Sequence, residues 1–155
     1  MVNRQVLLAI VCFVGVVVGV QPNYVKTTTY FTDGKDGSTT KNIVSVEWSD
    51  GLGRPIQSAV AAHPNADDKR KGIVAGTYYD AVGRPERQVR SFDHEFSGDP
   101  AYIDMKNDAL VDLAKSKFGN DPYPYSQTAY YDDPLGRAKT VYPVGVSFRS
   151  KPVKS

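Results

Sequence analysis

Apolar and polar residues alternate along much of the chain, a pattern that favours β-strands over helices. The alternation is clearest in residues 43–48 and 56–60, where it places one face of a strand on a core and the other toward water. Further strands are predicted at Tyr24 to Phe31, Ile73 to Tyr78 and Ser126 to Tyr131. The chain is therefore expected to be mainly β, with antiparallel β-hairpins in a curved sheet, and its first strand to pair with the strand that follows Ser38.

One seven-residue pattern occurs three times, and each copy lies between two predicted strands. It reads aromatic, any residue, Asp, small residue or Pro, aliphatic, Gly, Arg. Its defining residues are Trp48, Asp50, Gly53 and Arg54, then Tyr78, Asp80, Gly83 and Arg84, and last Tyr131, Asp133, Gly136 and Arg137. An internal repeat of this kind predicts that one structural unit is built three times.

The chemistry of the repeated pattern predicts a hairpin turn. Asp can accept a hydrogen bond from the backbone two residues further on, and Gly supplies the positive φ that ends the turn. Arg then begins the return strand, where the following Pro55 or Pro85 removes no hydrogen bond from the sheet. The aliphatic residue, which is Leu52, Val82 or Leu135, is expected to tuck under the turn. The motif residues are thus predicted to be structural.

An α-helix is predicted between the second and third repeats, where the repeat spacing grows from 30 to 53 residues. Asp99 can cap its start with Pro100 at the first helical position, and Gly119 can end it. Apolar residues three and four apart from Tyr102 onward give the segment one apolar face. The helix is therefore expected at about residues 100–118.

Residues 1–19 have the layout of a signal peptide. Arg4 precedes an apolar run from Val6 to Val18, which is shorter than the roughly 20 residues that a membrane-spanning helix needs. Val17 and Gly19 provide small residues just before a cleavage site. We expect export through the Sec pathway to the periplasm, the cell surface or the medium, with no membrane span after cleavage. The alternative is an uncleaved N-terminal anchor.

Charge and composition give no support for nucleic-acid binding. The formal net charge is only +2, whereas nucleic-acid binding needs a clustered basic face. The basic stretch from Lys69 to Lys71 follows two aspartates and is expected to lie in a solvated loop. The single cysteine, Cys12, lies within the predicted leader, so Cys-based zinc sites and redox motifs are excluded from the mature chain.

No arrangement of residues predicts catalysis or metal binding. The two histidines, His63 and His94, lie in polar stretches and are expected at the surface. The sequence has no nucleophile elbow and no phosphate-binding loop. Residues 33–37 faintly suggest a calcium loop, but Lys35 and Gly37 stand where oxygen ligands are needed, so a turn is expected. We therefore expect a non-enzymatic protein without catalytic, cofactor-binding or metal-binding residues.

The repeated units resemble the YD repeats of bacterial RHS proteins, which also occur in animal teneurins. The resemblance is carried by Asp-Gly-Leu-Gly-Arg-Pro at residues 50–55 and Tyr-Tyr-Asp-Ala-Val-Gly-Arg at residues 78–84. The order and spacing of further blocks are similar to the uncharacterised domain at the N-terminus of large RHS proteins. These blocks are Asn23 to Val25, Trp48 to Gln57, Pro124 to Thr128 and Asp133 to Arg137.

The resemblance implies a β-hairpin scaffold. In that family the repeats wind into a spiral sheet that forms a hollow shell, which in some members encloses a C-terminal toxin. Three repeats cannot close such a shell. The alternatives implied are a truncated relative, an accessory copy or a remnant of a larger RHS protein.

The expected organisation is a signal peptide at residues 1–19, an RHS/YD-repeat-like β domain at residues 20–145 and an irregular tail at residues 146–155. The leading hypothesis is an exported structural or interaction module whose partner is a second copy or a longer RHS chain. The alternative is a glycan-binding surface module that uses tyrosine-rich sheet faces. Cross-strand packing is a second explanation for the same rings, which are Tyr78, Tyr79, Tyr130 and Tyr131.

Overall fold

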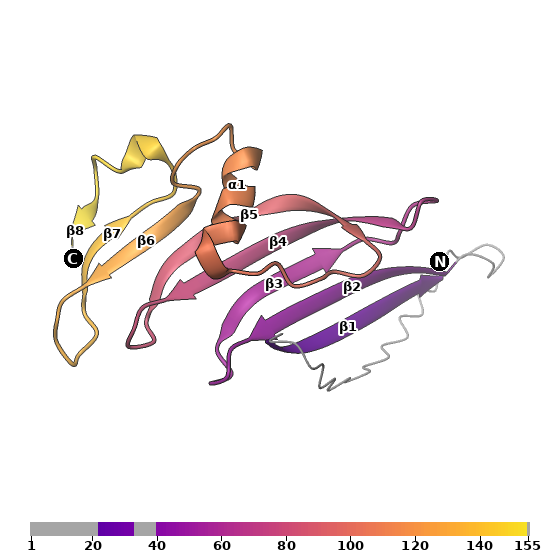
Figure 1. Cartoon of the computed structure of the whole chain (residues 1–155), viewed down its shortest axis with the longest axis horizontal. Coiled ribbons are helices and arrows are strands. Elements are labelled where there is room, and N and C mark those ends of the chain that lie inside the picture. Colours follow the sequence, from indigo (N-terminus) through magenta and orange to yellow (C-terminus); the bar gives the residue numbers. More distant parts are fainter. Residues whose placement is uncertain (1–21, 33–39, 155) are drawn as a thin grey trace, which may run out of the picture. The chain divides into compact units, whose positions relative to one another are not determined.

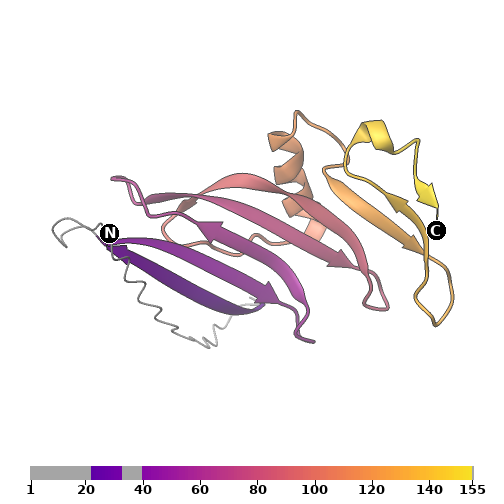
Figure 2. The ribbon, with the colours of Figure 1, turned by 180° about the vertical axis from the view of Figure 1, so that it is seen from behind.

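The computed structural model describes residues 22–32 and 40–154, so the predicted leader and the turn at residues 33–37 lie outside the described residues. The described strands form one open sheet in which each strand lies beside its sequence neighbours, from β1 to β8 (Figures 1 and 2). Their bounds are β1 Asn23–Thr32, β2 Thr40–Ser49, β3 Pro55–Ala61, β4 Lys69–Tyr79, β5 Pro85–Ser97, β6 Tyr125–Tyr130, β7 Ala138–Tyr142 and β8 Val153–Lys154. The predicted mainly β fold built of antiparallel hairpins is confirmed.

The first three strands follow the predicted alternation. β1 pairs with β2 along its whole length, which confirms the expected first hairpin. The register of β2 and β3 pairs Val44 with Ala61, Val46 with Ala59 and Trp48 with Gln57. All six of these side chains are buried, so alternate residues of the two strands form one core face.

The chain divides into two compact units rather than the single domain expected. The first contains the described residues up to Val74 together with Asp93–Tyr102, and the second contains Ala75–Phe92 and the residues from Ile103 onward. Strands β4 and β5 contribute residues to both units. The core of the first unit lies largely on β2 and β3.

The helix α1 (Ala109–Lys117) begins later than predicted. Residues 99–105 have no regular structure, and the short 3₁₀ turn η1 (Lys106–Asp108) precedes the helix. Asn107 and Asp108 have φ angles of 54° and 59°, a left-handed conformation that interrupts an α-helix. The predicted end is confirmed, because Gly119 follows the helix with a φ of 65°.

Helix α1 contacts the part of β5 that belongs to the second unit. Its buried side chains are Leu110, Val111 and Ala114. Arg87 of β5 pairs with Asp108 at 2.9 Å, just before the helix begins. The Arg90 guanidinium carbon lies 4.2 Å from the centre of the Phe118 ring, just after the helix ends. These contacts hold both ends of the helix.

The expectation of an irregular tail after Gly145 was wrong. The tail contains the 3₁₀ turn η2 (Val146–Phe148), and β8 pairs with β7. The Gly145 N–H donates to the Tyr123 carbonyl at 2.9 Å, and the Val146 N–H donates to the Asp121 carboxylate at 3.1 Å. These bonds join residues far apart in sequence, which is why local sequence patterns did not predict them.

Candidate functional site

The first two repeats form the same turn, organised by the motif aspartate. In the first, Asp50 Oδ1 accepts hydrogen bonds from the Leu52 and Arg54 backbone N–H groups, both at 2.9 Å. Its Oδ2 accepts a third from Arg54 Nε at 2.7 Å. Asp80 makes the same three bonds in the second repeat, at 3.0, 2.8 and 2.7 Å. The bond to the residue two positions on was predicted, whereas the pairing with the Arg side chain was not.

The motif glycines have the predicted backbone conformation. The φ angles are 78° at Gly53, 90° at Gly83 and 64° at Gly136. In the first two turns the glycine N–H donates to the carbonyl of the motif aspartate, at 3.0 and 2.9 Å. Each turn therefore depends on a conformation that glycine adopts without steric cost.

The two turn carboxylates are stabilised in their ionised form. The Arg54 backbone N–H, followed by the Arg54 guanidinium, holds the pKa of Asp50 below its ordinary value of 3.8. The Arg84 backbone N–H has the largest effect on Asp80 and lowers its pKa in the same way. A carboxylate with a lowered pKa is a poor general acid near neutral pH, which agrees with a structural role.

The third repeat forms a wider turn from the same residues. Asp133 again accepts from the N–H two positions on, at 2.9 Å, and pairs with Arg137 Nη2 at 2.8 Å. In the first two repeats, the backbone N–H of the motif aspartate donates to the carbonyl of the motif arginine and closes the turn. In the third repeat the donor to the Arg137 carbonyl is the N–H of Tyr131, two residues before the aspartate. The aspartate and arginine pairing thus accommodates two loop lengths.

The motif aliphatic residues lie on the outside of the turns, so the prediction that they tuck under them was wrong. Leu52, Val82 and Leu135 are 79%, 74% and 76% exposed. Backbone hydrogen bonds and the motif aspartate hold each turn together instead.

The motif aromatic residues have three different surroundings. Trp48 is buried, with its ring centre 6.0 Å from that of Tyr102. Tyr78 lies under the guanidinium of Arg87, 4.5 Å from its central carbon. Tyr131 is exposed. Trp48 and Tyr78 lie on strands, whereas Tyr131 follows the end of β6, so the shared position is not one recurring binding site.

Arg84 connects the second repeat to the third. Its guanidinium carbon lies 4.4 Å from the centre of the Tyr130 ring, and its Nη1 donates to the Tyr131 carbonyl at 3.4 Å. The Tyr130 hydroxyl donates in return to the Pro85 carbonyl at 2.8 Å. Arg84 Cδ also lies 3.7 Å from the point where a β-carbon on Gly136 would be. This arginine therefore has two functions, one in its own turn and one in the neighbouring hairpin.

A second arginine is surrounded by tyrosines in the same unit. The Arg149 guanidinium carbon lies 4.1, 5.0 and 5.1 Å from the ring centres of Tyr123, Tyr125 and Tyr142. Its Nη1 donates to the Gln127 side chain at 3.0 Å. These cation–π contacts hold the C-terminal residues on the sheet of this unit. Sequence reasoning missed Arg149 because nothing local distinguishes it from other basic residues of the tail.

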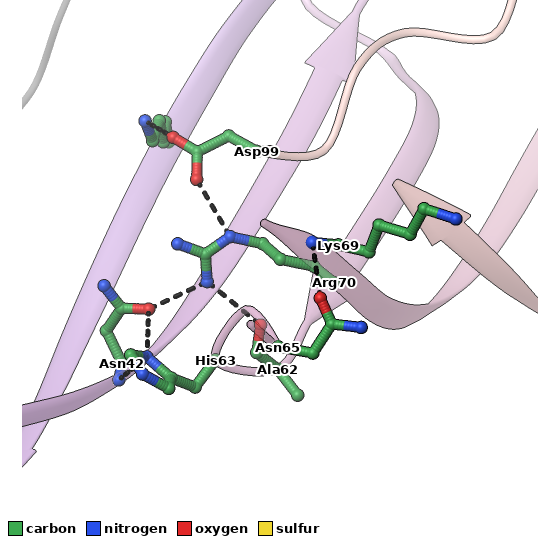
Figure 3. Close-up of polar contacts among 8 residues, drawn as sticks. Asn42, Ala62, His63, Asn65, Lys69, Arg70 and Asp99 are labelled. Atoms are coloured by element: carbon green, nitrogen blue, oxygen red, sulfur yellow. Dashed lines mark hydrogen bonds and ion pairs between the residues drawn. The ribbon is translucent and has the colours of Figure 1, made fainter. Parts of the chain in front are cut away.

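The first unit contains a polar cluster around Arg70 (Figure 3). The prediction that Lys69 to Lys71 form a solvated loop was wrong, because all three residues lie on β4. Lys69 and Lys71 are exposed, but Arg70 is only 7% exposed. Its Nη1 donates to Asn42 Oδ1 at 2.8 Å and to the Ala62 carbonyl at 2.9 Å. Its Nε lies 3.3 Å from Asp99 Oδ1.

Asp99 and both histidines also belong to the first unit. Asp99, the predicted helix cap, is paired with Lys26 as well as with Arg70. His63 is exposed as predicted and accepts the Asn42 backbone N–H at 3.3 Å. His94 is half-buried instead, with its ring against Phe96. The charged groups of the cluster pair with one another. These ion pairs hold the residues that follow β5 against the sheet of this unit.

The described part of the chain has no group of three or more His, Cys, Asp or Glu side chains that could hold a metal ion. Among the same residues, no helix is both long and apolar enough to cross a membrane.

Comparison with family models matches residues 21–155 to a domain of unknown function (DUF6443). The chain matches no curated protein and no solved structure.

Proposed function

The chain belongs to the DUF6443 family, and from this premise we propose that it is a non-enzymatic structural module that binds other protein chains through its sheet. The proposal includes export and kinship with RHS/YD-repeat proteins. It is supported by the three repeated turns, whose Asp and Arg side chains bind one another. A module of this kind associates with a second copy of itself or with a longer RHS chain.

The observation that carries the proposal is the edge strand β1. It is ten residues long and stands at one end of the described sheet, with β2 as its neighbour. Val25 is 57% exposed on this strand, and Tyr30 and Phe31 are each 41% exposed. A long edge strand with exposed apolar side chains is a template for the addition of another strand. Association along β1 would cover these side chains.

Light scattering after size-exclusion chromatography of the mature chain, over a range of concentrations, tests the proposal. Val25→Lys places a charge on the edge strand and should weaken self-association. Val60→Lys is the matched control, because Val60 is also an exposed strand valine, 47% exposed, but lies on β3 between two neighbouring strands. A wild-type protein that stays monomeric at about 50 μM and binds no RHS chain would contradict the proposal.

The alternative, a glycan-binding surface, has less support from the tyrosine contacts. Sugar stacking requires a free ring face, and among the rings expected to provide it Tyr78, Tyr130 and Tyr131 each have a guanidinium of the same chain against one face. A glycan array on the mature domain remains the direct test of this alternative.

A further inference from the structure

Strand β1 combines an edge position with almost no charge. Among the described strands it pairs only with β2 (Figure 1). Its one charged side chain is Lys26, whose amine is paired with the Asp99 carboxylate of the same chain. Charged side chains on an edge are one of the means by which proteins prevent strand addition. Because Asp99 neutralises the single charge, two copies of β1 can meet with little charge repulsion.

The register with β2 shows which side chains of β1 share a face. Tyr24, Lys26 and Thr28 lie opposite buried residues of β2, whereas Val25 and Phe31 lie on the other face of the sheet. A two-fold axis perpendicular to the sheet would join two antiparallel β1 strands and keep both faces continuous. Residues directly opposite each other then lie on the same face, so even-numbered residues pair with even-numbered ones and odd with odd.

Two registers meet this condition and use almost the whole of β1, which is Asn23–Thr32. One pairs residues 24–32 of the two copies and sets Thr28 opposite Thr28 of the second copy. The other pairs residues 23–31 and sets Thr27 opposite Thr27 of the second copy. Both use the same length of strand, so the side chains decide between them.

The side chains favour the first register. It sets Val25, which is 57% exposed, opposite Phe31 of the second copy, which is 41% exposed. Pairs of an aromatic and a β-branched residue across two strands stabilise a sheet. On the other face it sets Lys26 opposite Tyr30, so that a cation lies beside an electron-rich ring. The second register instead sets Phe31 opposite the polar side chain of Asn23.

We propose that the protein forms a two-fold dimer in which β1 pairs with β1 of a second copy, antiparallel and in the register that sets Val25 opposite Phe31. This inference deepens the proposed function and rests on it, since it selects a second copy as the partner of the edge strand. The two-fold axis makes each pair of unlike residues occur twice. Such a contact closes at two copies and does not continue into a fibre.

Cysteine cross-linking at the two-fold axis tests the register. Each variant is made in the 155-residue chain with Cys12→Ser, so that the introduced thiol is the only one. Thr28→Cys places the thiols of the two copies opposite each other, and mild oxidation should yield a covalent dimer at least about fivefold faster than for Thr27→Cys. Thr27→Cys is the matched control, because this neighbouring threonine lies on the axis only in the second register.

Two further measurements do not depend on the geometry of that one disulfide. Nitroxide labels on the same cysteines should show the strongest spin–spin broadening for Thr28→Cys. Thr27→Cys and Thr29→Cys should cross-link faster as an equal mixture than either does alone, because these two positions lie opposite each other in the proposed register.

The contribution of the apolar pair is measured by light scattering. Phe31→Ser removes the aromatic partner of Val25 and should raise the dissociation constant of the dimer at least about fivefold. Ile43→Ser is the matched control and should associate as the wild type does. Ile43 is 38% exposed and lies on the same face as Phe31, but it belongs to β2 and not to the edge strand.

The inference is overturned if cross-linking and broadening are both stronger for Thr27→Cys than for Thr28→Cys, or if Phe31→Ser and Ile43→Ser weaken association equally. The proposed function can fail or survive separately. A protein that dimerises without cross-linking or broadening at these positions would retain that function and lose this inference, as would one that binds an RHS chain but not itself. A chain that neither self-associates nor binds an RHS chain would lose both.

Discussion

Gly51 and Gly53 belong to the same turn but have different conformational demands. Gly53 has a φ of 78°, a region that residues with side chains rarely adopt, and no atom outside its chain neighbours lies within 4 Å of a β-carbon built there. Gly51 has the same open space without the left-handed φ. Any difference between substitutions at the two glycines therefore reports backbone strain rather than a steric clash.

The variant Gly53→Val should be less stable than the wild type by roughly 1–3 kcal/mol, because valine in the left-handed region is strained. Thermal and urea unfolding of the mature chain measure the difference. Gly51→Val is the matched control and should cost clearly less. Equal losses for both variants would show that the turn does not depend on the positive φ of Gly53.

At the scale of the secondary-structure elements, the hairpins could be predicted and the helix start could not. The alternation around Val44 and the Asp and Gly positions of the turns act within a few residues, so the sequence contains the needed information. The predicted start of the helix relied on Asp99 as its N-terminal cap. In the structure Asp99 instead pairs with Arg70, 29 residues earlier. Long-range pairing of this kind leaves no local pattern.

In the candidate site, too, the local features could be predicted and the long-range contacts could not. The motif residues and their turn-forming role follow from local chemistry. The contact of Arg84 with Tyr130 joins two repeats and depends on strand register, which the sequence alone did not specify. The exposed side chains of Leu52, Val82 and Leu135 were mispredicted because burial was assumed from residue type.

The turns should make the protein sensitive to acid. The pKa of Asp80 is lowered in the folded chain, so the unfolded chain binds protons more readily, and the stability that the carboxylate contributes is present above about pH 3.8. That contribution is lost as the pH falls through the lowered pKa of the folded state. Unfolding midpoints measured between about pH 6 and pH 2.5 should therefore decrease toward low pH.

Asp80→Asn keeps the side-chain oxygen that accepts the two backbone N–H groups but removes the charge. Its midpoint should fall less steeply with pH than that of the wild type, with the remaining slope due in part to Asp50. Asp132→Asn is the control, because Asp132 is exposed and lies outside these turn bonds. A wild-type slope in Asp80→Asn would show that the turn carboxylate does not contribute to acid sensitivity.

At the scale of the whole molecule, the leader stays a prediction, because residues 1–21 lie outside the described residues. Expression in a bacterial host with Sec export should yield a mature chain that begins at or near Val20, because the apolar run of the leader is short. N-terminal sequencing of the exported protein measures this. An intact Met1 in the membrane fraction would favour the anchor instead.

The division into two units also belongs to this scale. One domain was expected because the length of the mature chain is that of a single domain, and length does not say how many cores a chain forms. Val44 and Val46 lie in the first unit, whereas Leu110 and Val111 lie in the second. Strands β4 and β5 contribute to both units, so no single cut in the chain would separate the two units intact.

The sequential strand order has a consequence for how the chain is made. Each strand from β2 to β8 pairs with the strand that was synthesised just before it, so no strand has to wait for a distant part of the chain. Residues 98–124 separate β5 from β6, but the other described loops are short, which keeps the entropic cost of most pairings low and favours rapid folding. The sheet can therefore grow in the direction of synthesis. A pause at any hairpin would leave a sheet that is complete up to that strand, with its newest edge ready for the next one.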